Sequence, residues 1–404
     1  MTEGSEQTYD LVIKRAHVFD GHELLPGPRD VGLRGREISA ISETSLRGKR
    51  EVDAAGCWLM PGLIDTHVHF YDFRAVRDQA SLDAFIADDV GKLLDQFLQS
   101  GVTTIKSVGD PTTEILETRA RIAAGALRGP QLFTTGNGLT ASEGHPGSTI
   151  FSGNPWFRSR ATREVDSPQM MRDNVHFLAD RKVDAIKLLS EGGCKCQGGS
   201  PYIWQNPVFP NAVELIRLPK ATLRAGIEAA HERGLRVTVH TVQQAAAIEA
   251  IEAGADGLEH GVTVEPITDR AFIDMMVERK ATYASTLWIH DAVHPHTRTN
   301  TKLMADAGVA MVLGSDSFCG RGQFGQNTIE EAELMEASGL SPNEVLVAAT
   351  SRAAWHLERP DMGVISPGKR GDLILLSKDP LQTVANLRSL TMTVLGGEIV
   401  VDKR

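Results

Sequence analysis

The strongest constraint on the fold is a repeated alternation of short apolar strands and amphipathic helices through the middle of the chain. The expected strands cover residues 63–70, 102–105, 131–135, 185–189, 236–240, 257–260, 282–288 and 310–316. Helical spacing lies between many of them, as over residues 218–232 and 245–253. Strands separated by helices pair in parallel through right-handed crossovers. Eight such units predict an α/β fold in which the strands close into a (β/α)8 TIM barrel.

Both ends of the chain have the pattern of short β-strands. Residues 9–14, 18–19 and 36–41 are strand-like before the barrel, as are residues 372–376, 391–395 and 399–401 after it. Gly396-Gly397, between the last two strands, is a hairpin signal. Neither end is long enough to bury a core alone, so we expect both to join in one small β-sandwich. The predicted domains are a first sandwich part, 1–60, the barrel, 61–360, and a second sandwich part, 361–404.

The composition is that of an ordinary globular protein, with 41% hydrophobic and 23% charged residues among 404. A net charge of −10 argues against a nucleic-acid partner held by charge. We find no signal-peptide core and no apolar run of roughly 18 residues, so no membrane partner is expected. Four cysteines do not suggest a disulfide framework, and a cytoplasmic location is the resulting expectation. We further expect a small-molecule substrate and a homo-oligomer.

Ionisable side chains recur where the expected strands end. Residues two apart in a strand point to the same face, so His67 and His69 would present two imidazoles side by side. Imidazole is a common zinc ligand, although a single His-x-His pair is a weak signal. The fourth strand carries Lys187, and the ends of the fifth, sixth and eighth strands add His240, His260 and Asp316. Barrel active sites lie at this rim, so six converging residues indicate a metal centre.

Lys187 lies between Ile186 and Leu188 in an apolar strand. A buried, unpaired ammonium group is energetically costly. One interpretation is an ion pair with a carboxylate. The other is a carbamate formed with CO2, which is an anion able to bridge two metal ions. The position of the lysine in the sequence favours neither.

These six residues, in their order and strand placement, resemble the metal-dependent amidohydrolase superfamily. Two flanking segments are also similar to it: Met-Pro-Gly-Leu-Ile-Asp at 60–65 and Gly-Val-Ile-Ser-Pro-Gly-Lys-Arg-Gly-Asp-Leu at 363–373. Ile-Lys-Leu-Leu-Ser-Glu-Gly-Gly at 186–193 resembles the branch that contains Xaa-Pro dipeptidases and related amide hydrolases. That branch has a carboxylated lysine on its fourth strand. The imidazolonepropionases, which are similar overall, lack it.

The resemblance implies a metal-dependent hydrolase that cleaves an amide or peptide-type C–N bond. Its binuclear centre would hold two divalent ions, with zinc as the expected metal. His67, His69 and Asp316 would bind the first ion, His240 and His260 the second, and carboxylated Lys187 and a hydroxide would bridge them.

Two residues are implied to act on the substrate. Asp316 would accept the proton of the attacking hydroxide and pass it to the leaving amine. His145, within Glu-Gly-His-Pro-Gly, resembles a loop histidine that hydrogen-bonds the developing oxyanion, and a solvated loop histidine is the alternative. His290, His294 and His296 follow the seventh strand, from which they could reach the mouth of the barrel, although we expect a surface cluster.

Other functions fit the same ligands. The alternative is a mononuclear cyclic amidohydrolase or deaminase, similar to imidazolonepropionase, in which Lys187 is unmodified. A lactonase or phosphotriesterase would use the same hydroxide on another electrophile. A metal-binding module without activity is disfavoured, because all six ligand-type residues are present.

One position departs from the dipeptidase pattern. Those relatives carry a carboxylate-binding tyrosine two residues after the strand-five histidine, where this chain has Val242. Because valine donates no hydrogen bond, we expect neutral or capped amides to be preferred over free dipeptides. The expected apolar walls are Tyr202, Trp204 and Trp288, and an arginine that could replace the tyrosine is Arg158, Arg160 or Arg217.

Overall fold

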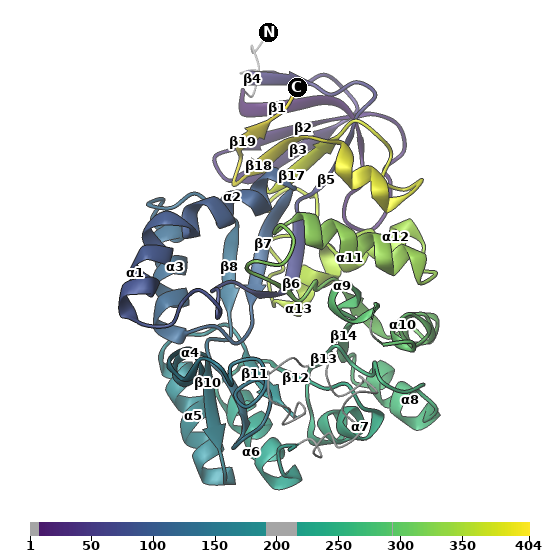
Figure 1. The fold of residues 1–404 in the computed structure, drawn as a ribbon. Helices are drawn as coiled ribbons and strands as arrows, with labels where there is room; N and C mark the ends of the chain where they lie inside the picture. Colours follow the sequence, from purple (N-terminus) through teal and green to yellow (C-terminus); the bar gives the residue numbers. More distant parts are fainter. Residues whose placement is uncertain (1–7, 191–215, 293) are drawn as a thin grey trace.

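The computed structural model describes residues 8–190, 216–292 and 294–404 (Figure 1). Strands from both chain ends join in one sheet of eight strands, the chain-end sheet, at the top of Figure 1. Its order is β19-β18-β17-β5-β1-β2-β3, and β4 pairs with β1. The strands are β1 (Tyr9–Val18), β2 (Arg29–Arg34), β3 (Glu37–Ser42), β4 (Gly48–Asp53), β5 (Trp58–Pro61), β17 (Leu373–Leu376), β18 (Leu390–Leu395) and β19 (Glu398–Asp402).

The two chain ends bury one common core. Strand β1 pairs antiparallel with β2 over its first part and in parallel with β5 at its last two residues. The apolar cluster beneath the sheet contains Ile13 and Val31 from the first end, and Leu373 and Met392 from the second. Each end thus supplies apolar surface that the other covers, because a few short strands alone cannot form a stable sheet.

The middle of the chain forms two parallel sheets. The first has the order β16-β6-β7-β8 and the second the order β10-β9-β11-β12-β13-β14-β15. Their strands are β6 (Leu63–His69), β7 (Val102–Ser107), β8 (Gln131–Thr134), β9 (Gly138–Ala141), β10 (Thr162–Val165), β11 (Ile186–Leu189), β12 (Val237–His240), β13 (Gly257–Glu259), β14 (Thr282–Ala284), β15 (Ala310–Val312) and β16 (Ser317–Phe318).

Backbone hydrogen bonds link the two parallel sheets. The Thr66 N–H donates to the Leu313 carbonyl at 3.0 Å, which connects β6 with the chain after β15. The Asp184 N–H donates to the Thr134 carbonyl at 2.8 Å, which connects the chain before β11 with β8. The strands that carry the predicted site residues therefore neighbour one another and run in the same direction.

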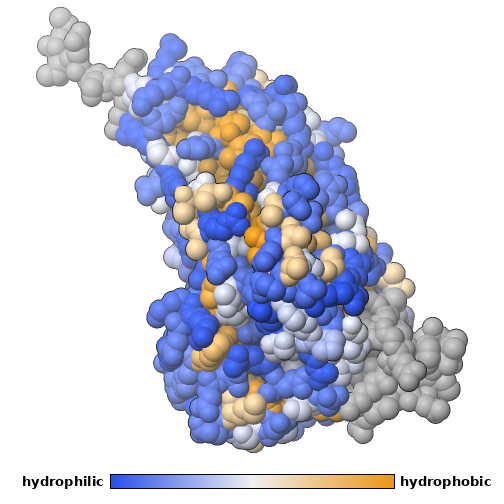
Figure 2. Space-filling view, turned by 60° about the vertical axis from the view of Figure 1, so that its left-hand side comes forward, coloured by the Kyte–Doolittle hydropathy of each residue, from blue (hydrophilic) through white to orange (hydrophobic). Residues whose placement is uncertain are grey.

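Helices cover the outside of the parallel strands (Figure 1). They are α1 (Gln79–Asp88), α2 (Val90–Gln99), α3 (Thr112–Ala123), α4 (Pro155–Ala161), α5 (Pro168–Asp180), α6 (Lys220–Glu232), α7 (Gln244–Ala253), α8 (Arg270–Glu278), α9 (Leu287–His290), α10 (Thr297–Asp306), α11 (Gln326–Ala337), α12 (Pro342–Ala348), α13 (Ser351–His356) and the 3-10 helix η2 (Val384–Ser389). Across the described residues, none of them is long and apolar enough to cross a lipid bilayer. The face in Figure 2 is largely hydrophilic, with an apolar area near its top.

Local signals in the sequence give the helix ends correctly. Gly254 ends α7 with a φ of 104°, a conformation that glycine adopts without steric cost. Ser341 and Glu344 form the predicted capping box at the start of α12. The prediction of a strand over 282–288 is wrong beyond Ala284. Thr286 adopts a φ of 46°, which ends the extended chain and leads into α9.

Candidate metal centre and active site

Two histidines and an aspartate meet at the carboxyl ends of β6 and β15. His67 and His69 project from the same face of β6, and their Nε2 atoms lie 3.3 Å apart. Asp316 Oδ1 lies 3.4 Å from His67 Nε2 and 3.1 Å from His69 Nε2. The Asp316 N–H donates to the His67 carbonyl at 2.8 Å, which fixes the aspartate beside the strand. The structure thus brings together three of the six predicted ligands.

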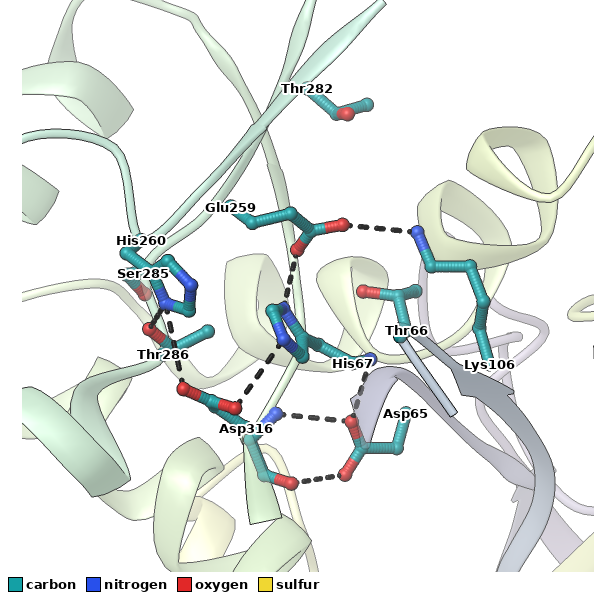
Figure 3. A network of polar contacts seen from close by, with 12 residues as sticks. Asp65, Thr66, His67, Lys106, Glu259, His260, Thr282, Ser285, Thr286 and Asp316 are labelled. Atoms are coloured by element: carbon teal, nitrogen blue, oxygen red, sulfur yellow. Dashed lines mark hydrogen bonds and ion pairs between the residues drawn. The ribbon is translucent and has the colours of Figure 1, made fainter. Parts of the chain in front are cut away.

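His260 reaches the same group from the chain that follows β13 (Figure 3). Its Nδ1 lies 3.7 Å from Asp316 Oδ2 and 2.8 Å from Thr286 Oγ1. One nitrogen each of His67 and His260 and one oxygen of Asp316 lie within 4.8 Å of one another, a spacing that could hold a metal ion. His260, Thr286 and Asp316 have φ values of 68°, 46° and 53°. Such left-handed conformations cost non-glycine residues roughly 1–3 kcal/mol and cluster at functional sites.

Further imidazoles extend from His260 in a row. The His240 ring, at the end of β12, lies 4.4 Å from that of His260. His145 stacks on His240 with the ring centres 4.6 Å apart. The His290 ring lies 4.9 Å from His260 and 4.9 Å from His294. The predicted loop histidine, His145, is therefore part of this row and is buried rather than solvated.

His290 and His294 are not the surface cluster that the sequence suggested. They are 7% and 2% exposed. Neither ring nitrogen of His290 has a hydrogen-bond partner among the described residues. His290 is the last residue of the short helix α9, and its burial agrees with the alternative that these histidines reach the mouth of the barrel. A buried imidazole with both nitrogens unmatched is costly, so His290 needs a structural explanation.

Burial determines the protonation of these side chains. Loss of hydration disfavours the imidazolium and lowers the pKa of His67 to about 4. The same cause lowers the pKa of the buried imidazoles of His145, His240, His260 and His290. Burial opposes the charge of Asp316, yet His67 and His69 hold the pKa of its carboxyl below the usual value. Neutral imidazoles and an ionised carboxylate are the forms that bind metals.

Lys187 lies in the middle of β11 and is 2% exposed. Its Nζ has no hydrogen-bond partner among the described residues, and none of the described carboxylates forms an ion pair with it. Burial lowers the pKa of this ammonium group to about 8, against the opposing charges of Glu259 and Asp316. The ion-pair interpretation of Lys187 therefore finds no support in the described part of the chain.

Two charged residues that sequence reasoning missed lie beneath the ligands. Glu259 Oε2 is 2.7 Å from His67 Nδ1, and Glu259 Oε1 accepts from Lys106 Nζ at 3.1 Å (Figure 3). Lys106 lies in β7, whose six residues are all buried, and Glu259 is the last residue of the buried strand β13. A charged residue in a buried strand is costly unless it is paired, and this is the signal that the sequence offers.

Asp65, within the flanking segment 60–65, braces the two ligand-bearing strands. Its Oδ1 accepts the N–H of Ser315 at 3.0 Å, and its Oδ2 accepts the hydroxyls of Ser315 and Thr328 at 2.7 Å each. Oδ1 also accepts the His67 N–H at 3.2 Å. Asp65 thereby fixes the end of β6 against the segment that carries Asp316.

The predicted substrate residues are only partly described. Tyr202 and Trp204 lie outside the described residues. Trp288 is half-buried on α9, its indole N–H donates to Glu330 at 2.7 Å, and its ring lies 6.4 Å from that of Phe318. Since Phe318 pairs with His69 between β16 and β6, this aromatic pair lies beside the ligands.

All three arginines suggested as carboxylate binders already have acidic partners. Arg158 forms ion pairs with Glu143 at 3.1 Å and with Glu164. Arg160 pairs with Glu114 at 2.7 Å, and Arg217 lies 3.6 Å from Glu249. Val242 is 4% exposed. Each of these three arginines would therefore have to leave an acidic partner before it could bind a substrate carboxylate.

The donor set fits a metal centre. It combines neutral imidazoles with one carboxylate that is 14% exposed, and it leaves Lys187 Nζ buried without a described partner. Imidazole and carboxylate suit zinc and its neighbours.

Comparison with known proteins agrees with this geometry. The model of the amidohydrolase family matches residues 58–400, so the chain belongs to that family. It is a hydrolase that acts on carbon–nitrogen bonds. It is 25% identical over 381 residues to an imidazolonepropionase of Anaeromyxobacter dehalogenans (strain 2CP-C), covering 87% of this chain and 84% of that protein.

Solved structures share the fold. A Xaa-Pro dipeptidase with bound methionine superposes with a TM-score of 0.81 at 21% identity, covering 97% of this chain and 99% of that one. Phenylurea hydrolase B gives a TM-score of 0.81 at 21% identity and covers 96% of both chains. The parallel strands and their helices therefore form a TIM-barrel-like α/β fold.

Proposed function

We propose that the protein is a binuclear metal-dependent hydrolase that cleaves an amide-type bond. His67, His69 and Asp316 would hold one divalent ion and His240 and His260 the other, and Lys187, once carboxylated, would supply a further anionic ligand. When bound, two such ions, expected to be zinc, would supply a hydroxide nucleophile near neutral pH and polarise the substrate carbonyl. One observation carries the proposal. Lys187 Nζ is buried among metal-type ligands and has no hydrogen-bond partner in the described part of the chain.

Carbamate formation suits this lysine. A neutral amine adds to CO2 and releases one proton, so the reaction needs a lysine that deprotonates near physiological pH. Burial lowers the pKa of Lys187 to about 8, which provides a neutral fraction. The product is an anion with two oxygen donors, and bound cations would offset the cost of burying it.

Asp316 and His145 act on the substrate. Asp316 Oδ1 lies 3.4 Å from His67 Nε2 and 3.1 Å from His69 Nε2, so its carboxylate would be available to accept the proton of the nucleophile. Asp316 then gives that proton to the leaving nitrogen. His145 Nδ1 is held by Thr149 Oγ1 at 2.9 Å, which leaves Nε2 to hydrogen-bond the oxygen of the tetrahedral intermediate.

The substrate is a neutral or capped amide, urea or carbamate. Val242 stands where a carboxylate-binding tyrosine would be required, and its side chain donates no hydrogen bond. The ion pairs of Arg158, Arg160 and Arg217 would have to break before these residues could bind a substrate carboxylate. Phenylurea hydrolase B, by its name, acts on a urea. Trp288 supplies part of an apolar wall, for which Tyr202 and Trp204 remain candidates.

Metal content tests the proposed site. Protein purified with Zn2+ and bicarbonate should contain two metal ions per chain by elemental analysis. Protein exchanged into 13C-bicarbonate should give a carbamate carbon signal that Lys187→Ala lacks. One ion per chain, with no carbamate signal, would overturn the binuclear assignment.

A matched substrate pair tests the specificity. N-benzoylglycinamide and N-benzoylglycine share the scissile amide and differ in the group on the leaving side. We expect a higher kcat/KM for the carboxamide. A preference for the free acid of tenfold or more, about 1.4 kcal/mol, would refute the neutral-substrate proposal.

A mononuclear cyclic amidohydrolase is the second candidate. The 25% identity with an imidazolonepropionase favours it, because the match covers most of both chains. In that case Lys187 would stay unmodified. The metal count and the carbamate signal described above separate the two candidates.

We also propose how the sheets close. The hydrogen bonds from Thr66 to Leu313 and from Asp184 to Thr134 support one closed (β/α)8 barrel over residues 61–360. The common core of the chain-end sheet supports a β-sandwich built from residues 1–60 and 361–404. An experimental structure with a closed eight-strand ladder and two layered end sheets is expected.

A homo-oligomer is likewise proposed, and light scattering of the purified protein tests it.

A further inference from the structure

We infer that Glu259 and Lys106 are positioning residues that hold His67 in the tautomer which a metal ligand requires. The inference rests on the proposed function in taking His67 as a ligand. It concerns neither the number of ions nor the substrate.

A continuous chain of polar contacts runs beneath His67. Glu259 Oε2 lies 2.7 Å from His67 Nδ1, and Glu259 Oε1 accepts a hydrogen bond from Lys106 Nζ at 3.1 Å. Lys106 Nζ is 2.7 Å from His356 Nε2, and His356 Nδ1 is 2.9 Å from Thr282 Oγ1. The contacts join β6, β13, β7, α13 and β14, so they connect elements that are far apart in the sequence.

The charged forms of Lys106 and Glu259, which form an ion pair, assign a direction to each hydrogen bond in this chain. A lysine ammonium group only donates, so His356 Nε2 accepts and His356 Nδ1–H donates to Thr282. An ionised carboxylate only accepts, so Glu259 receives protons from both Lys106 and His67. His67 Nδ1 therefore carries the hydrogen. In a neutral imidazole this leaves the lone pair on Nε2, the atom that faces His69 and Asp316.

The charges in the chain compensate one another. Lys106, Glu259 and His67 are each at most 1% exposed. The Glu259 carboxylate lies 3.1 Å from Lys106 Nζ on one side and 2.7 Å from His67 Nδ1 on the other, so each of its oxygens has a partner. A buried ion pair adds little net stability, because desolvation offsets its attraction. A pair placed directly against a metal ligand is instead suited to orienting that ligand.

Substitution of Glu259 by glutamine tests the positioning role, because one amide group cannot accept hydrogen bonds from both Lys106 and His67. Glutamine offers one accepting oxygen and one donating NH2. If the oxygen accepts from His67, the NH2 opposes the ammonium group of Lys106. If the oxygen accepts from Lys106, the NH2 faces His67 Nδ1, which must then lose its hydrogen to Nε2. The second arrangement blocks the metal-binding nitrogen.

The test compares Glu259→Gln, Lys106→Met and the double variant. Zn2+ affinity is measured by competition with a chromophoric chelator, and tautomers by 15N NMR of histidine-labelled, metal-free protein. We expect Glu259→Gln to lose about 10–100-fold in Zn2+ affinity and to show His67 protonated at Nε2. The double variant should recover part of the affinity, because glutamine can then accept from His67 without opposing an ammonium group.

A matched control separates positioning from stability. Asp372→Asn weakens a partly buried ion pair with Arg370 at 2.9 Å, in the segment directly before β17 of the chain-end sheet. It should lower Tm and leave Zn2+ affinity and the His67 signals unchanged. Should Glu259→Gln fail to fold, Glu259→Asp replaces it, since a shorter carboxylate cannot reach both partners and should also weaken Zn2+ binding.

Two outcomes overturn different conclusions. A wild-type protein that binds no Zn2+ would refute the proposed function. A wild-type protein that binds Zn2+, with Glu259→Gln equal to it in affinity and in the His67 signals, would refute the positioning role alone. The same holds if Glu259→Gln weakens binding no more than Asp372→Asn does at an equal loss of Tm.

Discussion

Lys187 is the residue on which the proposed chemistry depends most. Replacing it with alanine removes the group that would join the two ions, so metal content and turnover should both fall sharply. Short carboxylic acids such as acetate or propionate could occupy the vacated space and restore part of the rate. Lys92→Ala, which removes a surface lysine whose side chain is 74% exposed, serves as the control and should behave as wild type. Full metal content and a normal rate in Lys187→Ala would exclude the carbamate.

Asp316 should be separable into a ligand and a proton carrier. Asparagine is nearly isosteric with aspartate and can still coordinate through oxygen, but it cannot carry a proton between nucleophile and leaving group. We expect Asp316→Asn to keep much of its metal and to lose at least about a hundredfold in kcat. Elemental analysis and steady-state kinetics on the same preparation measure both. A rate near that of wild type would show that another group moves the proton.

The sequence indicated the ligands because all of them except Lys187, which lies within β11, stand at or near the end of an apolar strand. His67, His240 and Asp316 are unusual residues at such ends, and parallel strands bring these ends together. The partners of the ligands carried a weaker signal. Glu259 directly precedes His260 in a strand of three residues, and its orientation toward His67 depends on how distant strands pair. Contacts set by pairing between strands cannot be seen in one sequence.

At the scale of secondary structure, too, features set by local residues were predictable, and features set by tertiary contacts were not. Glycines and capping residues act locally, so helix ends at Gly254 and Ser341 were predictable. The short helix α9 was not, because it replaces an expected strand only after Thr286 enters the left-handed region. Its position is fixed by tertiary contacts from α11, where Glu331 Oε2 accepts the Trp288 N–H at 2.6 Å.

Glu331 makes the placement of α9 dependent on pH. Burial raises the pKa of its carboxyl to about 8, from an ordinary value of 4.5. The folded protein therefore holds this proton more tightly than the unfolded chain does. The folded state should lose stability as pH rises from about 4.5 to about 8, where the unfolded chain ionises first. Glu331→Gln removes this pH dependence of stability. The Tm of the variant minus the Tm of the wild type should therefore be larger at pH 8 than at pH 5. Thermal unfolding at both pH values measures the difference. An equal Tm difference at the two pH values would contradict the assignment.

At the scale of the whole molecule, strand β17 joins the chain-end sheet to the parallel strands. It lies between β5 and β18, and its four side chains are at most 1% exposed. Leu373 and Leu375 belong to the core of the chain-end sheet, whereas Ile374 and Leu376 belong to the core of the barrel-like part. Side chains alternate across a strand, so one backbone serves both cores. The Gly62 N–H donates to the Asp372 carbonyl at 2.9 Å, which links this strand to the segment that leads into β6.

This sharing predicts that the molecule unfolds as one unit. Ile374→Ala and Leu375→Ala should each lower the free energy of unfolding by roughly 2–5 kcal/mol, the usual cost of truncating a buried aliphatic side chain. Because β17 couples the two cores, both variants should shift one common transition, and tryptophan fluorescence, circular dichroism and metal release should report the same midpoint. Leu24→Ala, which truncates a side chain that is 40% exposed, is the matched control and should leave the midpoint nearly unchanged. If Leu375→Ala instead produced a separate early transition, with metal still bound after it, the chain-end sheet would be an independent folding unit and the proposed coupling would be wrong.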